Sequence, residues 1–191
     1  MRTNAPPRRR NVIWIFADQL RAQALGWNGD PNASTPVIDR MCAEGAFLQG
    51  AISGFPLCCP FRGSLVTGRY PHKCVPAHQA RLDPKQPTLA TPLREAGYHT
   101  AWIGKWHLDG FHERGHSKGD SGRSTFHTVP SDARGAFDHW LAFDNNNSQW
   151  DTWVHGHDSS GKEVPHFRVP GYETDGLTDL LIRYLEERAD T

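Results

Sequence analysis

Cys58 and Arg62 are the residues whose types and spacing most clearly allow chemistry. They stand in the run LCCPFRGSLVTGRYPH, behind a loop signalled by Gly54 and Pro56. Pro60 suits the first turn of a helix, so Cys58 is predicted at or just before a helix N-terminus, where backbone N–H groups and the helix dipole stabilise an anion. Arg62, one turn along, adds a fixed positive charge. The pattern predicts a reactive residue beside an anion site, and its alternative is a buried cysteine pair in a loop.

Two other kinds of cysteine site fit the spacing less well. A cysteine phosphatase loop needs more residues than separate Cys58 from Arg62, and the proline between them removes an amide donor. A zinc site made by Cys58, Cys59, His72 and Cys74 lacks the paired C-x-x-C spacing. Four cysteines are also too few for a disulfide scaffold, so reduced thiols are expected.

The elements that would position these residues alternate between strand and helix. Continuous apolar runs with β-branched or aromatic members predict buried strands, while capping signals beside apolar faces predict helices. In chain order the sequence predicts a strand at 12–17, a helix at 36–44, a strand at 46–52, helices at 60–67 and 88–96, and a strand at 99–104. This alternation predicts an α/β domain around a largely parallel sheet.

Polar residues follow two of the predicted strands directly. Asp18 and Gln19 come after the first strand, and Lys105 and His107 come after the third. In parallel sheets, ligands bind at the carboxyl ends of the strands, so these residues are candidates for a site at that edge. A solvated strand end is the alternative for Lys105 and His107.

The second half of the chain divides into an irregular region and a helix. Residues 108–170 are rich in Gly, His, Asp, Asn and Ser, and predict a loop-rich insertion on the substrate side. Its aromatic and amide side chains suit a sugar-like substrate or, equally, ordinary loop packing. Apolar residues at helical spacing predict a helix over 173–189. Because its broad apolar face needs a sheet to cover, a further strand is expected next, and the chain reads as truncated at its C-terminus.

Composition and charge argue against several kinds of partner. Lys and Arg number 21 and Asp and Glu number 21, so the formal charge is zero and neither nucleic acid nor an anionic membrane is expected to bind. The basic cluster at 8–10 falls in a leader, 1–10, that is expected to be disordered. No apolar run is long enough to cross a membrane, and the start does not have the pattern of a signal peptide. A cytoplasmic protein is therefore expected.

Several motifs together resemble one enzyme family. The run CCPFRGSLVTGRYPH is similar to the signature of type I sulfatases, Cys-x-Pro-x-Arg followed by Ser-Leu-x-Thr-Gly-Arg. NVIWIFADQLR resembles the family strand that ends in Asp-Asp or Asp-Gln, and GKWHL resembles a further core segment. TPVIDRMCAEGAF and GYETDGLTDLLIRYLEE resemble two family helices. The matches occur in family order and cover most of the chain outside 110–170, so the chain is identified as the N-terminal portion of a formylglycine-dependent sulfatase.

The resemblance implies a fold, a reaction and roles for four residues. The fold would be alkaline-phosphatase-like, three layers α/β/α with a largely parallel central sheet, and 11–191 would be the N-terminal part of the catalytic domain. Cys58 would be oxidised to formylglycine by a formylglycine-generating enzyme, and the hydrated aldehyde would attack the sulfur of a sulfate ester and later release sulfate. Arg62 would hold the hydrated aldehyde. Lys105 and His107 would contact the sulfate oxygens, and His107 could also move a proton.

The resemblance also implies a divalent metal ion, usually calcium. Asp18 and Gln19 would bind it through oxygen, together with a formylglycine oxygen from Cys58. Many relatives have Asp where Gln19 stands, and the Asp-Gln form also occurs in relatives that cleave phosphate or phosphonate esters. Phe61 occupies a position that is usually small in the family. The remaining metal ligands and a second catalytic His and Lys are expected beyond residue 191, so the isolated chain is expected to be inactive or very weakly active.

Three other functions stay open at this point. The first is a phosphonate monoester hydrolase or phosphodiesterase on the same fold. The second is a non-catalytic fragment that binds an anion or a partner, and the third is a metal-free cysteine hydrolase. For the sulfatase interpretation, the sequence leaves an aryl sulfate, choline sulfate or a sulfated sugar as the substrate, with a carbohydrate favoured by the Asn- and Trp-rich insertion.

Overall fold

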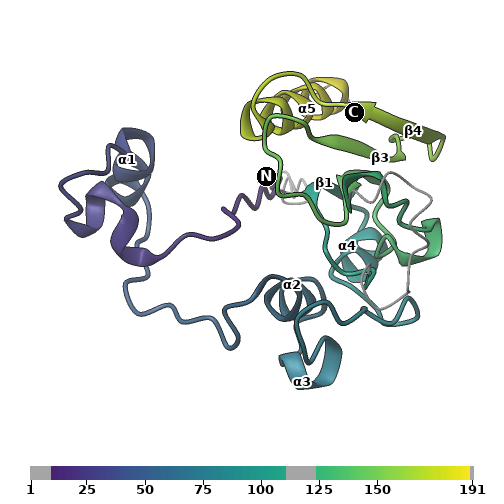
Figure 1. Cartoon of the computed structure of the whole chain (residues 1–191), viewed down its shortest axis with the longest axis horizontal. Helices are drawn as coiled ribbons and strands as arrows, with labels where there is room; N and C mark the ends of the chain where they lie inside the picture. Colours follow the sequence, from purple (N-terminus) through teal and green to yellow (C-terminus); the bar gives the residue numbers. More distant parts are fainter. Residues whose placement is uncertain (1–9, 111–123, 190–191) are drawn as a thin grey trace, which may run out of the picture. The chain divides into compact units, whose positions relative to one another are not determined.

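The computed structural model describes residues 10–110 and 124–189 and divides the chain into two compact units. The first unit ends at Ala51 and the second begins at Ile52 (Figure 1). The expected leader, 1–10, lies outside the described residues except for Arg10, and so does part of the expected insertion, 111–123. No described helix combines the length and the apolar character needed to cross a membrane.

The first unit contains one α-helix and two short 3-10 helices. These elements are α1, Pro36–Glu44, with η1, Ala22–Ala24, and η2, Gly26–Asn28. Pro36 begins α1 after Thr35, as the sequence predicts. The hydroxyl of Thr35 accepts a hydrogen bond from the amide of Gly26 and donates one to Asp39, at 3.0 and 2.7 Å. The start of α1 is thereby tied to the turn before it.

The two strands predicted over 12–17 and 46–52 are absent, which corrects the sequence prediction. Residues 12–17 and 46–52 form no strand, and Val12 and Ile15 are about three-quarters exposed, at 75% and 76%. A strand exists only through hydrogen bonds to a neighbour, and within the first unit residues 12–17 form no strand pairing. An apolar run alone could not reveal that.

The second unit contains a mixed four-stranded sheet in the order β1-β2-β3-β4. The strands are β1 (Ala101–Lys105), β2 (His139–Phe143), β3 (Trp153–His157) and β4 (Glu163–Arg168). β1 and β2 are parallel, whereas β3 is antiparallel to both of its neighbours. The α/β class is as predicted, but among the described strands only the first pairing is parallel.

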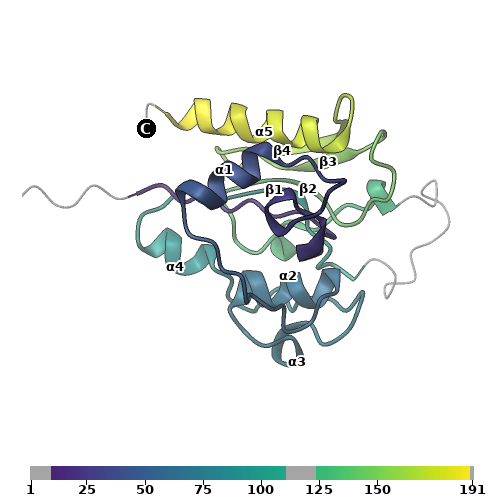
Figure 2. The same ribbon diagram turned by 90° about the vertical axis from the view of Figure 1, so that its left-hand side faces the viewer.

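Helices cover both faces of this sheet, which gives three layers (Figures 1 and 2). On one side lie α2 (Cys58–Thr67), the short α3 (Pro71–Cys74) and α4 (Ala90–Glu95), around a core that includes Val66, Trp106 and Trp140. On the other side α5 (Glu173–Arg188) packs Leu177 and Leu180 against Phe143 and Val154. The predicted helix at the end of the chain therefore does cover a sheet.

The region 108–170 is more regular than its composition predicts. It holds β2, β3, β4 and two 3-10 helices, η3 (Ser124–Phe126) and η4 (Ser131–Ala133). Every residue of β2 is buried, so its sequence has no alternation to detect. In β3, Gly156 has φ 145°, and a side chain there would collide with the backbone of Trp140. A glycine that resembles a loop signal is thus required inside a strand.

The buried imidazole of His155 predicts that acid destabilises the second unit. Burial lowers the pKa of His155 from 6.5 to about 3, helped by the nearby His166 and Arg134. Its Nε2 accepts a hydrogen bond of 2.9 Å from the amide of Val129. Because the folded pKa is depressed, this contribution to stability is complete above pH 6.5 and is lost as the pH falls from 6.5 towards 3.

We expect wild type to lose about 3 kcal/mol of stability through His155 between pH 7 and pH 4. A His155→Gln variant keeps an acceptor for Val129 but does not titrate, so its stability should fall less over the same interval. Urea unfolding at both pH values measures this, with the exposed His72→Gln as the control. Equal pH dependence in wild type and His155→Gln would contradict the prediction.

Candidate active site

The start of α2 presents Cys58 at the head of a ten-residue helix. Cys58 is the first helical residue, and Leu57 before it is extended. The helix begins two residues earlier than Pro60, because the amide of Phe61 already bonds to the carbonyl of Leu57 at 2.9 Å. Cys58 is half-buried. A group at this position lies beside the unpaired amides of the first turn, where negative charge is stabilised.

The neighbouring Cys59 has a different environment. It is fully buried, its sulfur accepts a hydrogen bond from the amide of Gln79 at 3.1 Å, and the Nδ1 of His78 lies 3.9 Å away. Burial raises the pKa of the Cys59 thiol to about 11. Cys59 is therefore a packed, protonated thiol, and Cys58 is the more accessible of the two.

Lys105 and Arg62 converge on the start of α2. The ammonium of Lys105, the last residue of β1, lies 3.8 Å from the sulfur of Cys58. Arg62 is 3% exposed, and its Nε donates a hydrogen bond of 3.3 Å to the carbonyl of Lys105. Two cations from two different elements thus lie at or near one residue, which makes the position suitable for an anion.

His107 occupies a constrained turn just after β1. It is 3% exposed and has φ 53°, a left-handed conformation that is uncommon for a residue with a side chain. Its ring meets that of His78 edge-on, with 5.6 Å between the ring centroids. The amide of Trp106 bonds to the carbonyl of Phe143 at 2.8 Å, so the pairing with β2 continues past Lys105 and fixes where the turn begins.

Buried acidic residues behind this turn were missed by sequence reasoning. Asp109 contacts Arg81 at 3.0 Å and His127 at 2.7 Å. The amide of Asp109 donates to Asp144 at 3.0 Å, and burial raises the pKa of the Asp144 carboxyl above its ordinary range. These contacts hold the turn that carries His107. Asp144 follows β2 directly, so recognising β2 as a strand parallel to β1 would have placed it at the same edge.

The predicted metal ligands Asp18 and Gln19 belong to the first unit. Both are exposed and lie in a bend after the extended segment, and the structure describes them only within that unit. Among the described residues, no group of three or more His, Cys, Asp or Glu side chains is placed to hold a metal ion. The structure thus brings Cys58, Arg62 and Lys105 together, with His107 just beyond.

Comparisons with known proteins agree on one family. The sequence model of the family named Sulfatase matches residues 10–191. The ulvan-active sulfatase of Formosa agariphila is 34% identical over 160 residues, which cover 77% of this chain and 29% of that protein. The N-acetylglucosamine-6-O-sulfatase of Bacteroides thetaiotaomicron is 30% identical and covers 95% of this chain and 28% of its own length. The chain therefore spans less than a third of these relatives.

A solved structure extends the likeness to the fold. The protein yidJ of Bacteroides fragilis, which is named as a sulfatase, superposes with a TM-score of 0.73 at 25% identity. The match covers 91% of this chain and 39% of yidJ. The alkaline-phosphatase-like α/β fold expected from the sequence is thereby confirmed.

Proposed function

This chain belongs to the sulfatase family, and on that premise we propose that it contributes the nucleophile and the anion-binding residues of a sulfuric ester hydrolase. One observation carries the proposal: the Lys105 ammonium lies 3.8 Å from the Cys58 sulfur, at the N-terminus of α2. A nucleophile placed where negative charge is stabilised suits an anionic ester.

Cys58 is the residue that a formylglycine-generating enzyme would oxidise. Pro60 follows it at the spacing of the family signature, and Cys58 is accessible where Cys59 is buried. When formed, hydrated formylglycine supplies the oxygen nucleophile for attack on sulfur. The aldehyde oxygen of formylglycine would take the place of the Cys58 sulfur.

The neighbouring side chains supply charge and orientation. Lys105 would neutralise the negative charge that builds up on the sulfate oxygens. Arg62 would hold the nucleophile, and its hydrogen bond to the carbonyl of Lys105 links α2 to β1. His107 follows Lys105 within the same turn and could transfer a proton to the leaving oxygen. Arg62 and His107 are both buried, so their side chains have little freedom to move away.

A divalent cation, of which calcium is the best candidate, would complete the family's chemistry. Asp18 and Gln19, in the first unit, offer the oxygen ligands that calcium prefers. The donors that the structure brings together among its described residues do not make up a complete calcium site. No step of the reaction is therefore assigned to the ion.

The substrate would be a sulfated carbohydrate. Two of the relatives described above, the ulvan-active sulfatase and the N-acetylglucosamine-6-O-sulfatase, are named for carbohydrates. A second candidate, a phosphonate monoester hydrolase, is favoured by one feature, the amide of Gln19 where many sulfatases have a carboxylate.

Parallel assays of the complete natural protein test the proposal. After co-expression with a formylglycine-generating enzyme, we expect kcat/KM for an aryl sulfate to exceed that for an aryl phosphonate monoester by at least tenfold, about 1.4 kcal/mol of transition-state free energy. A reversed ratio would replace the proposed reaction by phosphonate hydrolysis.

A further inference from the structure

The loop after β2 places an exposed tryptophan against a tyrosine that directly precedes α5, at the edge of the sheet where Lys105 lies. Lys105 of β1 is in register with Phe143, the last residue of the parallel β2, so both strands end together. The loop that follows presents Trp150, which is 68% exposed. The ring of Trp150 packs against that of Tyr172, with centroids 5.3 Å apart and planes at 52°.

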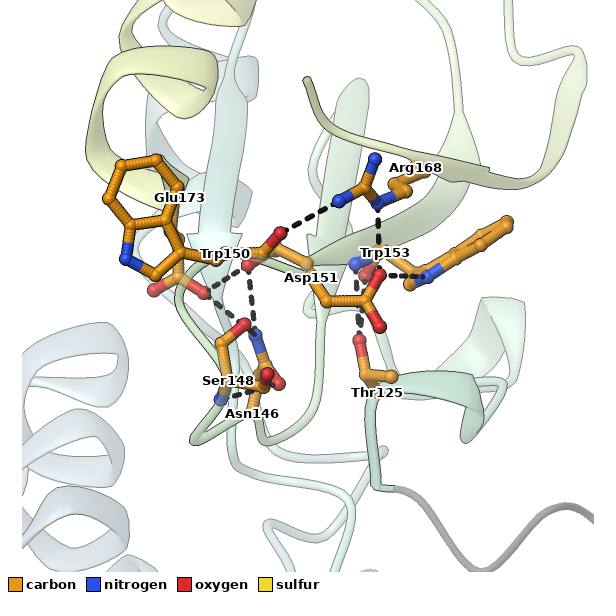
Figure 3. A network of polar contacts seen from close by, with 9 residues as sticks. Thr125, Asn146, Ser148, Trp150, Asp151, Trp153, Arg168 and Glu173 are labelled. Atoms are coloured by element: carbon orange, nitrogen blue, oxygen red, sulfur yellow. Dashed lines mark hydrogen bonds and ion pairs between the residues drawn. The ribbon is translucent and has the colours of Figure 1, made fainter. Parts of the chain in front are cut away.

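Hydrogen bonds fix this loop to the start of α5 (Figure 3). The side-chain amide of Asn146 donates to Thr152 and to Glu173, each at 2.9 Å. The hydroxyl of Thr152 donates to the same carboxylate of Glu173 at 2.6 Å. One carboxylate at the first turn of α5 thus holds both ends of the loop.

The backbone on both sides of Trp150 is held as well. The amide of Glu173 donates to the carbonyl of Gln149 at 2.7 Å, and Arg168 donates to the carbonyl of Trp150 at 2.8 Å. Arg168 also binds Asp151 at 3.0 Å. The indole projects away from this ion pair (Figure 3). The backbone that carries the indole of Trp150 is therefore held in place on both sides. The exposed indole does not gain the free energy that burial of an apolar ring would supply.

We propose that Trp150 and Tyr172 form a stacking surface for a sugar ring next to the one that carries the scissile sulfate ester. This inference rests on the proposed function. One face of a sugar ring presents C–H groups that pack on an aromatic ring, whereas its edges present hydroxyls. The residues around Trp150 are polar, namely Asn146, Asn147, Ser148, Gln149 and Asp151.

This polar surround favours a carbohydrate over a protein or a lipid. A docking helix or a bilayer needs a broad apolar patch, and the neighbours of Trp150 along the loop, residues 146–149 and 151, are polar. Amides are suitable partners for hydroxyls, and Asn147 and Gln149 in the same loop are exposed. The substrate class that fits is therefore a chain of sugars longer than the sulfated unit alone.

Calorimetric binding to the complete natural protein tests this assignment, with a sulfated oligosaccharide and an aryl sulfate as the two probes. Trp150→Ala should weaken oligosaccharide binding about tenfold, or about 1.4 kcal/mol, and leave aryl sulfate kcat/KM unchanged. Trp150→Phe, which keeps a ring, should restore most of the affinity. Tyr70→Ala is the matched control, because Tyr70 is another exposed aromatic of the second unit, 76% exposed. Circular dichroism checks that each variant is folded.

Each outcome separates this inference from the proposed function. Oligosaccharide affinity that is unchanged in Trp150→Ala overturns the stacking surface. Aryl sulfate turnover by a wild type that does not bind the oligosaccharide also overturns it, while the proposed reaction stands. Oligosaccharide binding that depends on Trp150, in a protein that hydrolyses no sulfate ester, supports the surface and refutes the reaction.

Discussion

Replacing Cys58 by alanine should abolish aryl sulfate hydrolysis by the complete natural protein, with a loss of roughly 10⁴- to 10⁶-fold in kcat. Alanine at this position cannot be converted to formylglycine, so the oxygen nucleophile is missing while the cations around it remain. Steady-state assays of protein co-expressed with the modifying enzyme measure the effect. Because Cys58 is only half-buried, the variant should fold as wild type does.

Cys59→Ala is the matched control for this experiment. Cys59 is fully buried and its thiol pKa is raised to about 11, so its contribution is packing rather than reactivity. Its substitution should lower stability by about 1 kcal/mol and leave kcat within a few-fold of wild type. A Cys58→Ala enzyme with ordinary turnover, or a Cys59→Ala enzyme without any, would contradict the assignment.

Lys105→Met should lower kcat for an aryl sulfate by roughly 10²- to 10³-fold, the usual cost of removing one preorganised charge from a developing anion. The ammonium of Lys105 lies 3.8 Å from the Cys58 sulfur, and methionine has a similar length without the charge. The exposed Lys162→Met is the control, because it removes the same charge from the connection between β3 and β4.

A second variant of the same residue tests whether the charge of Lys105 matters more than its shape. Lys105→Arg keeps a cation and should recover part of the lost kcat. If Lys105→Met and wild type have equal kcat, the ammonium does not stabilise the transition state. If Lys105→Met instead unfolds at a lower urea concentration while Lys105→Arg does not recover activity, its role is structural.

The parts of the fold that the sequence predicts are those specified by local patterns. α1 begins at the predicted Thr35-Pro36 pair, and α5 has the predicted apolar spacing. Cys58 at the start of α2 follows from Pro60 and from the loop signalled by Gly54 and Pro56. These signals lie within one or two helical turns of the residues they position, so no knowledge of tertiary contacts is needed.

The parts that the sequence did not predict depend on partners distant in the chain. The run 12–17 has the composition of a buried strand, yet it forms no strand within the first unit. The buried contacts of Asp109 with His127 and Asp144 require β1 and β2 to lie side by side first. For the same reason the contact between Lys105 and Cys58 was not predicted. The sequence indicated only that Lys105 lies at the edge of the sheet where ligands bind.

The most direct test of the central claim is the mass of the tryptic peptide that contains Cys58, from protein co-expressed with a formylglycine-generating enzyme. Conversion of a cysteine to formylglycine lowers the peptide mass by roughly 18 Da, and fragmentation distinguishes the two adjacent positions. We predict that the loss occurs at Cys58 and that Cys59 keeps its thiol. An unmodified Cys58, or a mass loss at Cys59, would contradict the account.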